Sequence, residues 1–269
     1  MRDTNAAVRL LAIDTATTLC GVAVLDLEPG TAGGIFGLEG GQGGVRAAVR
    51  RHGVSTHSEM LLPLIAEVLD ELASSPRELS AVVCGAGPGS FTGLRIGIAT
   101  AKGLCFALGI PLLMVSSLHA LGVGALQRSS WPRPVLATLN AFRGQVFARL
   151  VLPAGYAPEA ELQRLLTEHP SLLTDAVWAP AALATLLAPC AEQLGLCGGG
   201  LVSYPLLRLA GATVLDDDPS PHPLAVLQLG AARLLNGESD PLAAASPNYI
   251  CASAAEENAA PGRAVTGGR

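Results

Sequence analysis

Residues 81–109 read AVVCGAGPGSFTGLRIGIATAKGLCFALG, and this stretch decides the fold. The apolar run 81–84 predicts a buried strand, residues 85–93 a glycine-rich loop, and the proline-free segment 94–108 a helix. A strand, a glycine-rich turn and a helix in that order can aim backbone N–H groups at an anion. The alternative is a tight connection in which the glycines serve packing alone.

The loop lacks the two phosphate-binding signatures that such glycines often mark. No Lys-Ser or Lys-Thr pair closes the turn, and the order G-A-G-P-G does not match G-x-G-x-x-G. The loop therefore indicates contact with a phosphate or carboxylate without naming the ligand. The candidate anion-contact or nucleotide-contact residues are Asp14, Thr17, Gly87, Gly89, Ser90, Thr92, Arg95, Arg143 and Gly144.

Small residues recur at every fourth position of the predicted helix. Gly93, Gly97, Ala101 and Cys105 fall on one helical face. Such a stripe lets another element approach closely along ridges and grooves. Two interpretations are open: a contact within this chain, against its sheet or a neighbouring helix, or a docking face for a partner helix.

Composition sets limits on the class of protein. The 269 residues suffice for one large domain or two compact lobes, and half of them are hydrophobic. A formal net charge of −5 disfavours direct binding of a nucleic-acid backbone, although a partner can supply that contact. The cysteines form no C-x-x-C pair, no signal peptide precedes the first strand, and no uncharged span of about 20 apolar residues occurs. We therefore expect a cytoplasmic protein with no membrane association.

The order of predicted elements indicates two α/β lobes. Strands are expected at 8–14, 21–27, 81–84, 112–115, 135–139, 145–152, 194–197 and 212–215, with a weak third strand interrupted by a loop at 29–44. Helical segments are expected at 58–72, 94–108, 117–127, 158–167, 174–189, 201–209 and 222–236. We predict an N-terminal lobe at 8–112 with 222–250 packed back on it, a C-terminal lobe at 113–221, and a disordered tail at 252–269.

Several segments together resemble one known family. They are LAIDTATTLCGVAV at 11–24, HSEMLLPL at 57–64, GAGPGSFTGLRIGIATAKGLCFALGIP at 85–111 and VSSLHAL at 115–121. On these residues the chain resembles the bacterial TsaB (YeaZ) family. The resemblance continues more loosely through NAFRGQVFARL at 140–150 and PNYI at 247–250.

The resemblance implies a fold and a task. The fold is the two-lobed actin/sugar-kinase/Hsp70-like fold with a degenerate active cleft. The task is formation of N6-threonylcarbamoyladenosine at position 37 of tRNA, as a non-catalytic scaffold that binds the TsaD transferase and enables the ATPase TsaE to engage. No intrinsic cofactor and no metal site are implied: ATP and Mg²⁺ enter through the complex, and tRNA is met only indirectly.

The resemblance also implies where a partner binds. The helices predicted at 58–72 and 94–108 would pack against the transferase, and the same face could pair two copies of this chain when no partner is present. The expected interface residues are His57, Glu59, Leu61, Leu62, Ile65, Leu69, Gly93, Gly97, Ala101 and Cys105.

Departures from enzyme patterns support a non-catalytic reading. Catalytic members of the fold carry a D-x-G-T phosphate loop, and here Ala16 takes the place of its glycine. Asp14 is left to coordinate Mg²⁺ or to cap the turn, and both readings are open. In the sister subunit two histidines form a metal site, and their positions here are Ser117 and Leu121. The intervening His119 is expected to be a surface or partner contact.

The second-lobe turn departs from the family pattern D-A-R-R-G-E-V-Y. Asn140 and Gln145 replace two acidic residues, while Arg143 and Gly144 are kept. Loss of a carboxylate removes a general base or metal ligand, which fits a cleft that does no chemistry. The alternative function is an ATP-binding enzyme of the same fold, an ATPase or kinase-like protein. A protease is disfavoured because neither a nucleophile–histidine trio nor an HExxH motif stands out.

Overall fold

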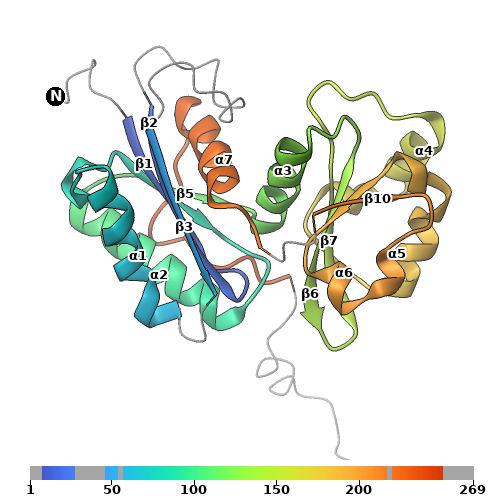
Figure 1. The fold of residues 1–269 in the computed structure, drawn as a ribbon, viewed down its shortest axis with the longest axis horizontal. Coiled ribbons are helices and arrows are strands. Elements are labelled where there is room, and N and C mark those ends of the chain that lie inside the picture. Colours follow the sequence, from blue (N-terminus) through green and yellow to red (C-terminus); the bar gives the residue numbers. More distant parts are fainter. Residues whose placement is uncertain (1–7, 28–45, 54–56, 217–219, 251–269) are drawn as a thin grey trace, which may run out of the picture.

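The structure, a computed structural model, describes residues 8–27, 46–53, 57–216 and 220–250 (Figure 1). Within these ranges the chain forms two five-stranded sheets, in the orders β3-β2-β1-β4-β5 and β10-β9-β6-β7-β8. Helices cover the sheets, so each lobe is an α/β layer structure. The predicted tail at 252–269 and the segment 29–44 lie outside the described residues.

The first lobe is built on a hairpin and two parallel strands. Its strands are β1 (Val8–Asp14), β2 (Leu19–Leu27), β3 (Arg46–Gly53), β4 (Ala81–Gly85) and β5 (Leu112–Val115). β1 pairs antiparallel with β2 and parallel with β4, and β4 pairs parallel with β5. The third strand, β3, runs beside β2 at 46–53, later in the chain than the segment in which the sequence suggested one.

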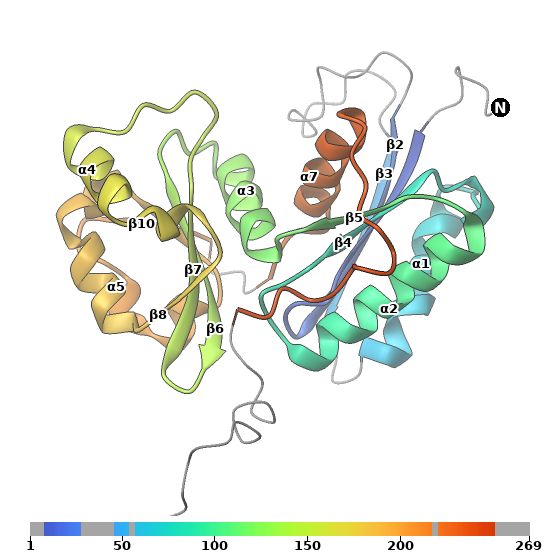
Figure 2. The same ribbon diagram turned by 180° about the vertical axis from the view of Figure 1, so that it is seen from behind.

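Both faces of the first sheet are buried. Helices α1 (His57–Glu71) and α2 (Phe91–Leu108) lie on one face, and α7 (Pro223–Leu235) lies on the other (Figures 1 and 2). Alternate residues of β1 face opposite ways, so Leu11 joins the α1–α2 core and Leu10 joins the α7 core. A strand that is covered on both sides is apolar throughout, which explains the continuous run in β1.

The second lobe has the same layered construction. Its strands are β6 (Val135–Phe142), β7 (Gln145–Val151), β8 (Ala176–Trp178), β9 (Gly195–Cys197) and β10 (Thr213–Asp216). Its helices are α3 (Ser117–Ser129), α4 (Ala160–Glu168), α5 (Pro180–Leu187) and α6 (Gly200–Ser203), with 3-10 turns at 170–173, 188–193 and 205–207. A further 3-10 turn, at 76–78, belongs to the first lobe.

Three predictions of element bounds are wrong. The helix expected at 201–209 is the short α6, which ends at Ser203, followed by the 3-10 turn at 205–207, because Pro205 cannot donate the backbone hydrogen bond that would continue the helix. The single helix expected at 174–189 is strand β8 followed by α5, because the residue before a proline favours extended backbone and Pro180 can start a helix. The lobe boundary at 112–113 falls inside β5, which pairs with β4 from Leu112 to Val115. The first lobe therefore runs through Val115, and Ser116 caps α3 by accepting a hydrogen bond from the His119 N–H.

The segment 240–250 connects the two lobes along their shared side (Figure 2). The backbone N–H of Asn248 donates to the carbonyl of Ala86 in the first lobe over 2.7 Å. The side-chain amide of Asn248 donates to Asp175 in the second lobe over 3.2 Å. Ile250 then packs against an apolar cluster of the second lobe. We call 240–250 the strap, because it contacts both lobes.

The small-residue stripe of α2 faces inward. A Cβ atom on Gly97 would lie 2.3 Å from Oγ1 of Thr15, and one on Gly93 would lie 2.2 Å from the Thr15 carbonyl oxygen. Ala101 and Cys105 are fully buried in the core beneath α1 and α2. The intramolecular interpretation of the stripe is therefore the right one. Its assignment to a partner interface is wrong because the chain's own β1–β2 turn and sheet occupy that face.

By length and composition alone, α2 is apolar enough to cross a membrane. The core helix of a soluble protein passes the same test, and α2 packs its apolar face on the first sheet. It also carries Arg95 and Lys102, each hydrogen-bonded to the strap. In this structure α2 is a packed surface helix of the first lobe.

The inward stripe generates a stability prediction with an internal control. Gly97→Ala is expected to lower the free energy of unfolding by about 1–3 kcal/mol, because Thr15 is held by its hydrogen bond to the Gly93 carbonyl. Gly103→Ala, on the same helix where a Cβ atom would meet nothing within 4 Å, is expected to raise it by about 0.5–1 kcal/mol. Urea unfolding of both variants measures the difference. Equal stability of the two would contradict the packing described.

Candidate functional site

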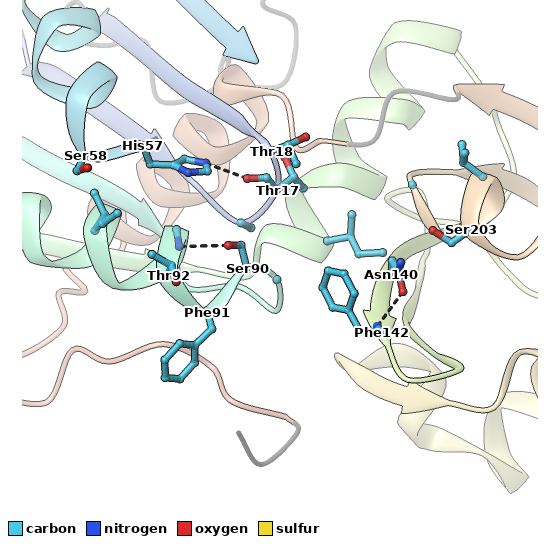
Figure 3. A pocket seen from close by; sticks show the side chains of 17 residues that line it. Thr17, Thr18, His57, Ser58, Ser90, Phe91, Thr92, Asn140, Phe142 and Ser203 are labelled. Carbon is cyan, nitrogen blue, oxygen red and sulfur yellow. Dashed lines mark hydrogen bonds between the residues drawn. The ribbon is translucent and has the colours of Figure 1, made fainter. Parts of the chain in front are cut away.

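A cleft of about 970 Å³ lies between the two lobes (Figure 3). The first lobe contributes the β1–β2 turn, the start of α1 and the loop that enters α2. The second lobe contributes the end of β6 and α6. The walls combine apolar side chains with hydroxyl and amide groups. Among the described residues that line the cleft, none is an aspartate, glutamate, lysine or arginine.

The predicted anion-contact residues divide into two groups. Four of them line the cleft: Thr17, Gly89, Ser90 and Thr92. Five do not line it: Asp14, Gly87, Arg95, Arg143 and Gly144. The lining of the cleft therefore includes the predicted hydroxyl groups but neither of the predicted cations, Arg95 and Arg143.

The carboxylate of Asp14 is buried and accepts hydrogen bonds from the protein itself. Its side chain is 2% exposed. One carboxylate oxygen accepts from the Ala16 N–H over 3.0 Å, and the other accepts from the Ser117 hydroxyl over 2.6 Å. A Cβ atom on Gly85 would fall 2.0 Å from that second oxygen, so backbone closes the remaining side. The turn-capping reading of Asp14 matches this geometry, because both carboxylate oxygens already accept hydrogen bonds from the protein.

The glycine-rich loop packs on the β1–β2 turn. The Ser90 N–H donates to the Ala16 carbonyl over 2.7 Å. A Cβ atom on Gly89 would approach that carbonyl oxygen to 2.1 Å, and no other residue type allows this contact. Ser90 caps α2 by accepting from the Gly93 N–H. The chain's own backbone therefore lies against the loop, as the packing alternative for the glycines requires.

His57 holds the start of α1 to the same turn. Its side chain is buried, and its Nε2 lies 2.9 Å from the Thr17 carbonyl oxygen (Figure 3). A carbonyl only accepts, so Nε2 carries the proton and donates. A nitrogen used this way is not placed to act as a base. His57 is a structural residue at the rim of the cleft.

Arg95 is directed toward the strap. Its Nε donates to the Tyr249 hydroxyl over 3.0 Å, and its guanidinium carbon lies 3.8 Å from the centre of the Phe91 ring. The rings of Phe91 and Tyr249 are 5.4 Å apart, within the range of aromatic pairs. Sequence reasoning missed Tyr249, because its partners lie about 150 positions away in the chain.

Most of the predicted partner-interface residues are buried. On α1 these are His57, Leu61, Ile65 and Leu69, which face the sheet together with the α2 stripe. Only Glu59 and Leu62 from the predicted set lie on the outer surface. The prediction is wrong for the others, because it took the apolar side of each helix as the docking side.

The outer face of the two helices has its own apolar residues. Leu62 on α1 is 58% exposed and Phe106 on α2 is 84% exposed. Ala99 and Gly103 are exposed small residues of α2, seven and three positions before Phe106, and so share its face of the helix. We call Leu62, Ala99, Gly103 and Phe106 the outer helix face. The sequence-based prediction of the interface missed Phe106. The signal available in the sequence was a large aromatic residue of the predicted helix that lies outside the small-residue stripe.

Comparison with known proteins finds relatives that match about half of the chain. A family profile described as "TsaD: tRNA N6-adenosine threonylcarbamoyltransferase" matches residues 48–153. The "tRNA threonylcarbamoyladenosine biosynthesis protein TsaB" of Escherichia coli (strain K12) is 36% identical over 139 residues, which are 52% of this chain and 53% of that protein. The protein of the same name from Bacillus subtilis (strain 168) is 33% identical over 141 residues, 52% and 54% of the two chains. The chain spans about half the length of these curated relatives.

A solved structure extends the match over both lobes. "YeaZ from Pseudomonas aeruginosa" is 27% identical with a TM-score of 0.68, and the match covers 90% of this chain and 99% of that chain. The chain therefore resembles the TsaB/YeaZ family in sequence over about half its length and in fold over both lobes. Its two α/β lobes share the fold of that YeaZ structure, as the resemblance implied.

His119 lies near the junction of the lobes, in the first turn of α3. The pKa of its imidazole is lowered from 6.5 to about 4, mainly by burial and in part by Arg149, while Asp175 acts in the opposite direction. Asp175 itself accepts from the Ser116 hydroxyl over 2.8 Å and from Arg149 over 3.2 Å. His119 is half-buried. It is not the open surface contact that the sequence suggested.

His119 makes stability depend on pH in a defined window. The unfolded chain takes up the proton near pH 6.5 and the folded chain only near pH 4. The free energy of unfolding is therefore expected to fall as pH drops from 6.5 toward 4, by up to about 3 kcal/mol at ~1.4 kcal/mol per pKa unit. His119→Gln should remove this part of the loss in urea unfolding across that range. An imidazole that titrates near 6.5 in the folded protein, followed by NMR, would contradict the expectation.

Proposed function

We propose that this chain is the non-catalytic scaffold and activator subunit in the formation of N6-threonylcarbamoyladenosine at tRNA position 37. It binds a TsaD-like transferase and enables a TsaE-like ATPase to engage, in the cytoplasm. The names of its TsaB relatives support the pathway. The transferase profile that matches residues 48–153 supports kinship with the partner. The outer helix face is the observation that carries the scaffold role.

The outer helix face has the properties of a helix-docking surface. Phe106 and Leu62 leave large apolar side chains in water, and burying each is worth roughly 1.5–3 kcal/mol. At Gly103 a Cβ atom would meet nothing within 4 Å, so the surface is open there and a partner backbone can approach closely. We assign this face to a helix pair of the transferase, and a second copy of this chain is the competing occupant.

The cleft supports a scaffold over an enzyme. Its described lining offers no carboxylate for a metal ion or a general base, and no cation for a phosphate. Asp14 is already satisfied by Ser117 and the Ala16 N–H. The residues present therefore do not fit Mg²⁺-ATP, and we assign no step to a nucleotide bound in this chain. In this proposal ATP and Mg²⁺ act through the assembled complex, and the acidic chain meets tRNA only there.

Reconstituted tRNA modification tests the proposed role. Threonylcarbamoyl-adenylate, tRNA, ATP, a TsaD-like transferase and a TsaE-like ATPase are combined with and without this chain. Modification is expected to require the chain, and the chain alone is expected to hydrolyse no ATP. Full modification in its absence, or ATP turnover by the chain alone, would replace the scaffold with the alternative of an ATP-binding enzyme.

A pair of variants tests the docking face. Phe106→Asp is expected to weaken transferase binding at least 30-fold by calorimetry, because a central aromatic anchor is commonly worth about 2 kcal/mol or more. Leu206→Asp is the matched control, since Leu206 is 51% exposed on the other lobe and should leave binding unchanged. Circular dichroism checks that both variants fold. Equal binding by both would remove the face from the interface, and a defect limited to self-association in ultracentrifugation would assign the face to a homodimer.

A further inference from the structure

The second-lobe wall of the cleft ends in a strained turn. Phe142 has φ of 62° and Arg143 has φ of 50°, a left-handed backbone that non-glycine residues seldom adopt. The register of β6 against β7 shifts between Asn140 and Phe142, which marks a bulge. Bulges of this kind re-aim a side chain, and backbone strain of this kind gathers at functional sites. Here the re-aimed side chain is that of Phe142.

The bulge places an apolar ring in the cleft. Figure 3 shows the Phe142 ring projecting from the end of β6 toward the first lobe. It is 65% exposed, and Val202 on α6, which also lines the cleft, is 63% exposed. The other apolar lining residues are Ala16, Phe91, Ile96 and Leu139. The cleft thus presents a flat aromatic surface that the protein itself leaves largely uncovered.

The side-chain amide of Asn140 lines the same wall of the cleft, and its hydrogen bonds determine how it is oriented. Its Oδ1 accepts from the Phe142 N–H over 2.7 Å and from the Tyr204 hydroxyl over 3.3 Å. Two donors on one side of the amide decide which atom is oxygen, so the NH₂ group points the other way. That NH₂ group has no hydrogen-bond partner among the residues that the structure describes. An aspartate would keep both accepted bonds and would have nothing to donate.

The absence of charged side chains among the described lining residues favours an uncharged ligand. An ionised group would lose its hydration in the cleft without an opposite charge among the described lining residues. A neutral ligand with apolar faces and a few polar atoms suits such a cleft. We propose that the interlobe cleft binds an uncharged, flat, amphipathic molecule that stacks on Phe142 and accepts a hydrogen bond from Asn140. This site is separate from the outer helix face and does not depend on the scaffold role.

Matched probes test the charge preference. The full chain is titrated with 2-naphthamide and with its isostere 2-naphthoate, and both are followed by ¹⁵N–¹H NMR. The amide is expected to give saturable shifts at the Asn140 side-chain NH₂ and at the Phe142 and Val202 backbone, with at least tenfold tighter binding than the carboxylate. Equal binding of the two probes, or no saturable shift at the cleft, would overturn the proposal.

Variants test the two contact residues. Asn140→Asp is expected to weaken 2-naphthamide binding at least tenfold while it keeps the bonds from Phe142 and Tyr204. Phe142→Ala should weaken it to a similar degree by removing the stacking surface. Asn236→Asp, at the exposed end of α7, is the control that should leave the affinity unchanged. Undiminished binding by folded Asn140→Asp would show that the donor is not used and would overturn the assignment of Asn140.

Discussion

The first lobe depends on one close approach, that of the β1–β2 turn to the loop and helix that follow β4. The turn reaches the α2 backbone only because Gly89, Gly93 and Gly97 have no side chain where Thr15 and Ala16 lie. The Thr15 hydroxyl donates to the Gly93 carbonyl, and the Ala16 carbonyl accepts from Ser90. These contacts join β1, β2 and α2 into one body. The protein backbone therefore fills the place beside the loop where the sequence allowed an anion as one of two alternatives.

The two faces of α2 follow from the same packing. Because Gly93 and Gly97 pack against Thr15, and Ala101 and Cys105 lie in the core, the inward face is closed to a partner. Interaction is then left to residues that the core does not need. The exposed large apolar residues on α1 and α2 are Leu62, Phe91 and Phe106, and of these Phe91 already packs against Tyr249 of the strap. A helix whose position is fixed by tight contacts on one side is a rigid platform on the other. Because α2 is already ordered, this chain loses less conformational entropy when a partner docks on it.

The junction of the lobes rests on a small polar cluster. Asp175 of the second lobe accepts hydrogen bonds from Ser116, where the chain passes between the lobes, and from Asn248 of the strap. Tyr249 of the strap contacts Phe91 and Arg95 at the start of α2. The cleft therefore lies between walls that are tied together at one side. The position of Phe142 relative to the first lobe depends on these ties.

Local sequence pattern was sufficient for most elements of the first lobe and for the family resemblance, but not for β3 or β8. Continuous apolar runs predict β1 and β4, and glycines predict the loop, because each of these signals acts within a few residues. Which side of α2 faces inward was not decidable from spacing, since a small-residue stripe serves a sheet or a partner equally well. Asn140 could be recognised in sequence as a lost acid, but its amide orientation required Phe142 and the distant Tyr204. Burial, charge balance in the cleft and the pKa of His119 arise from residues far apart in the chain, so only the tertiary structure decided them.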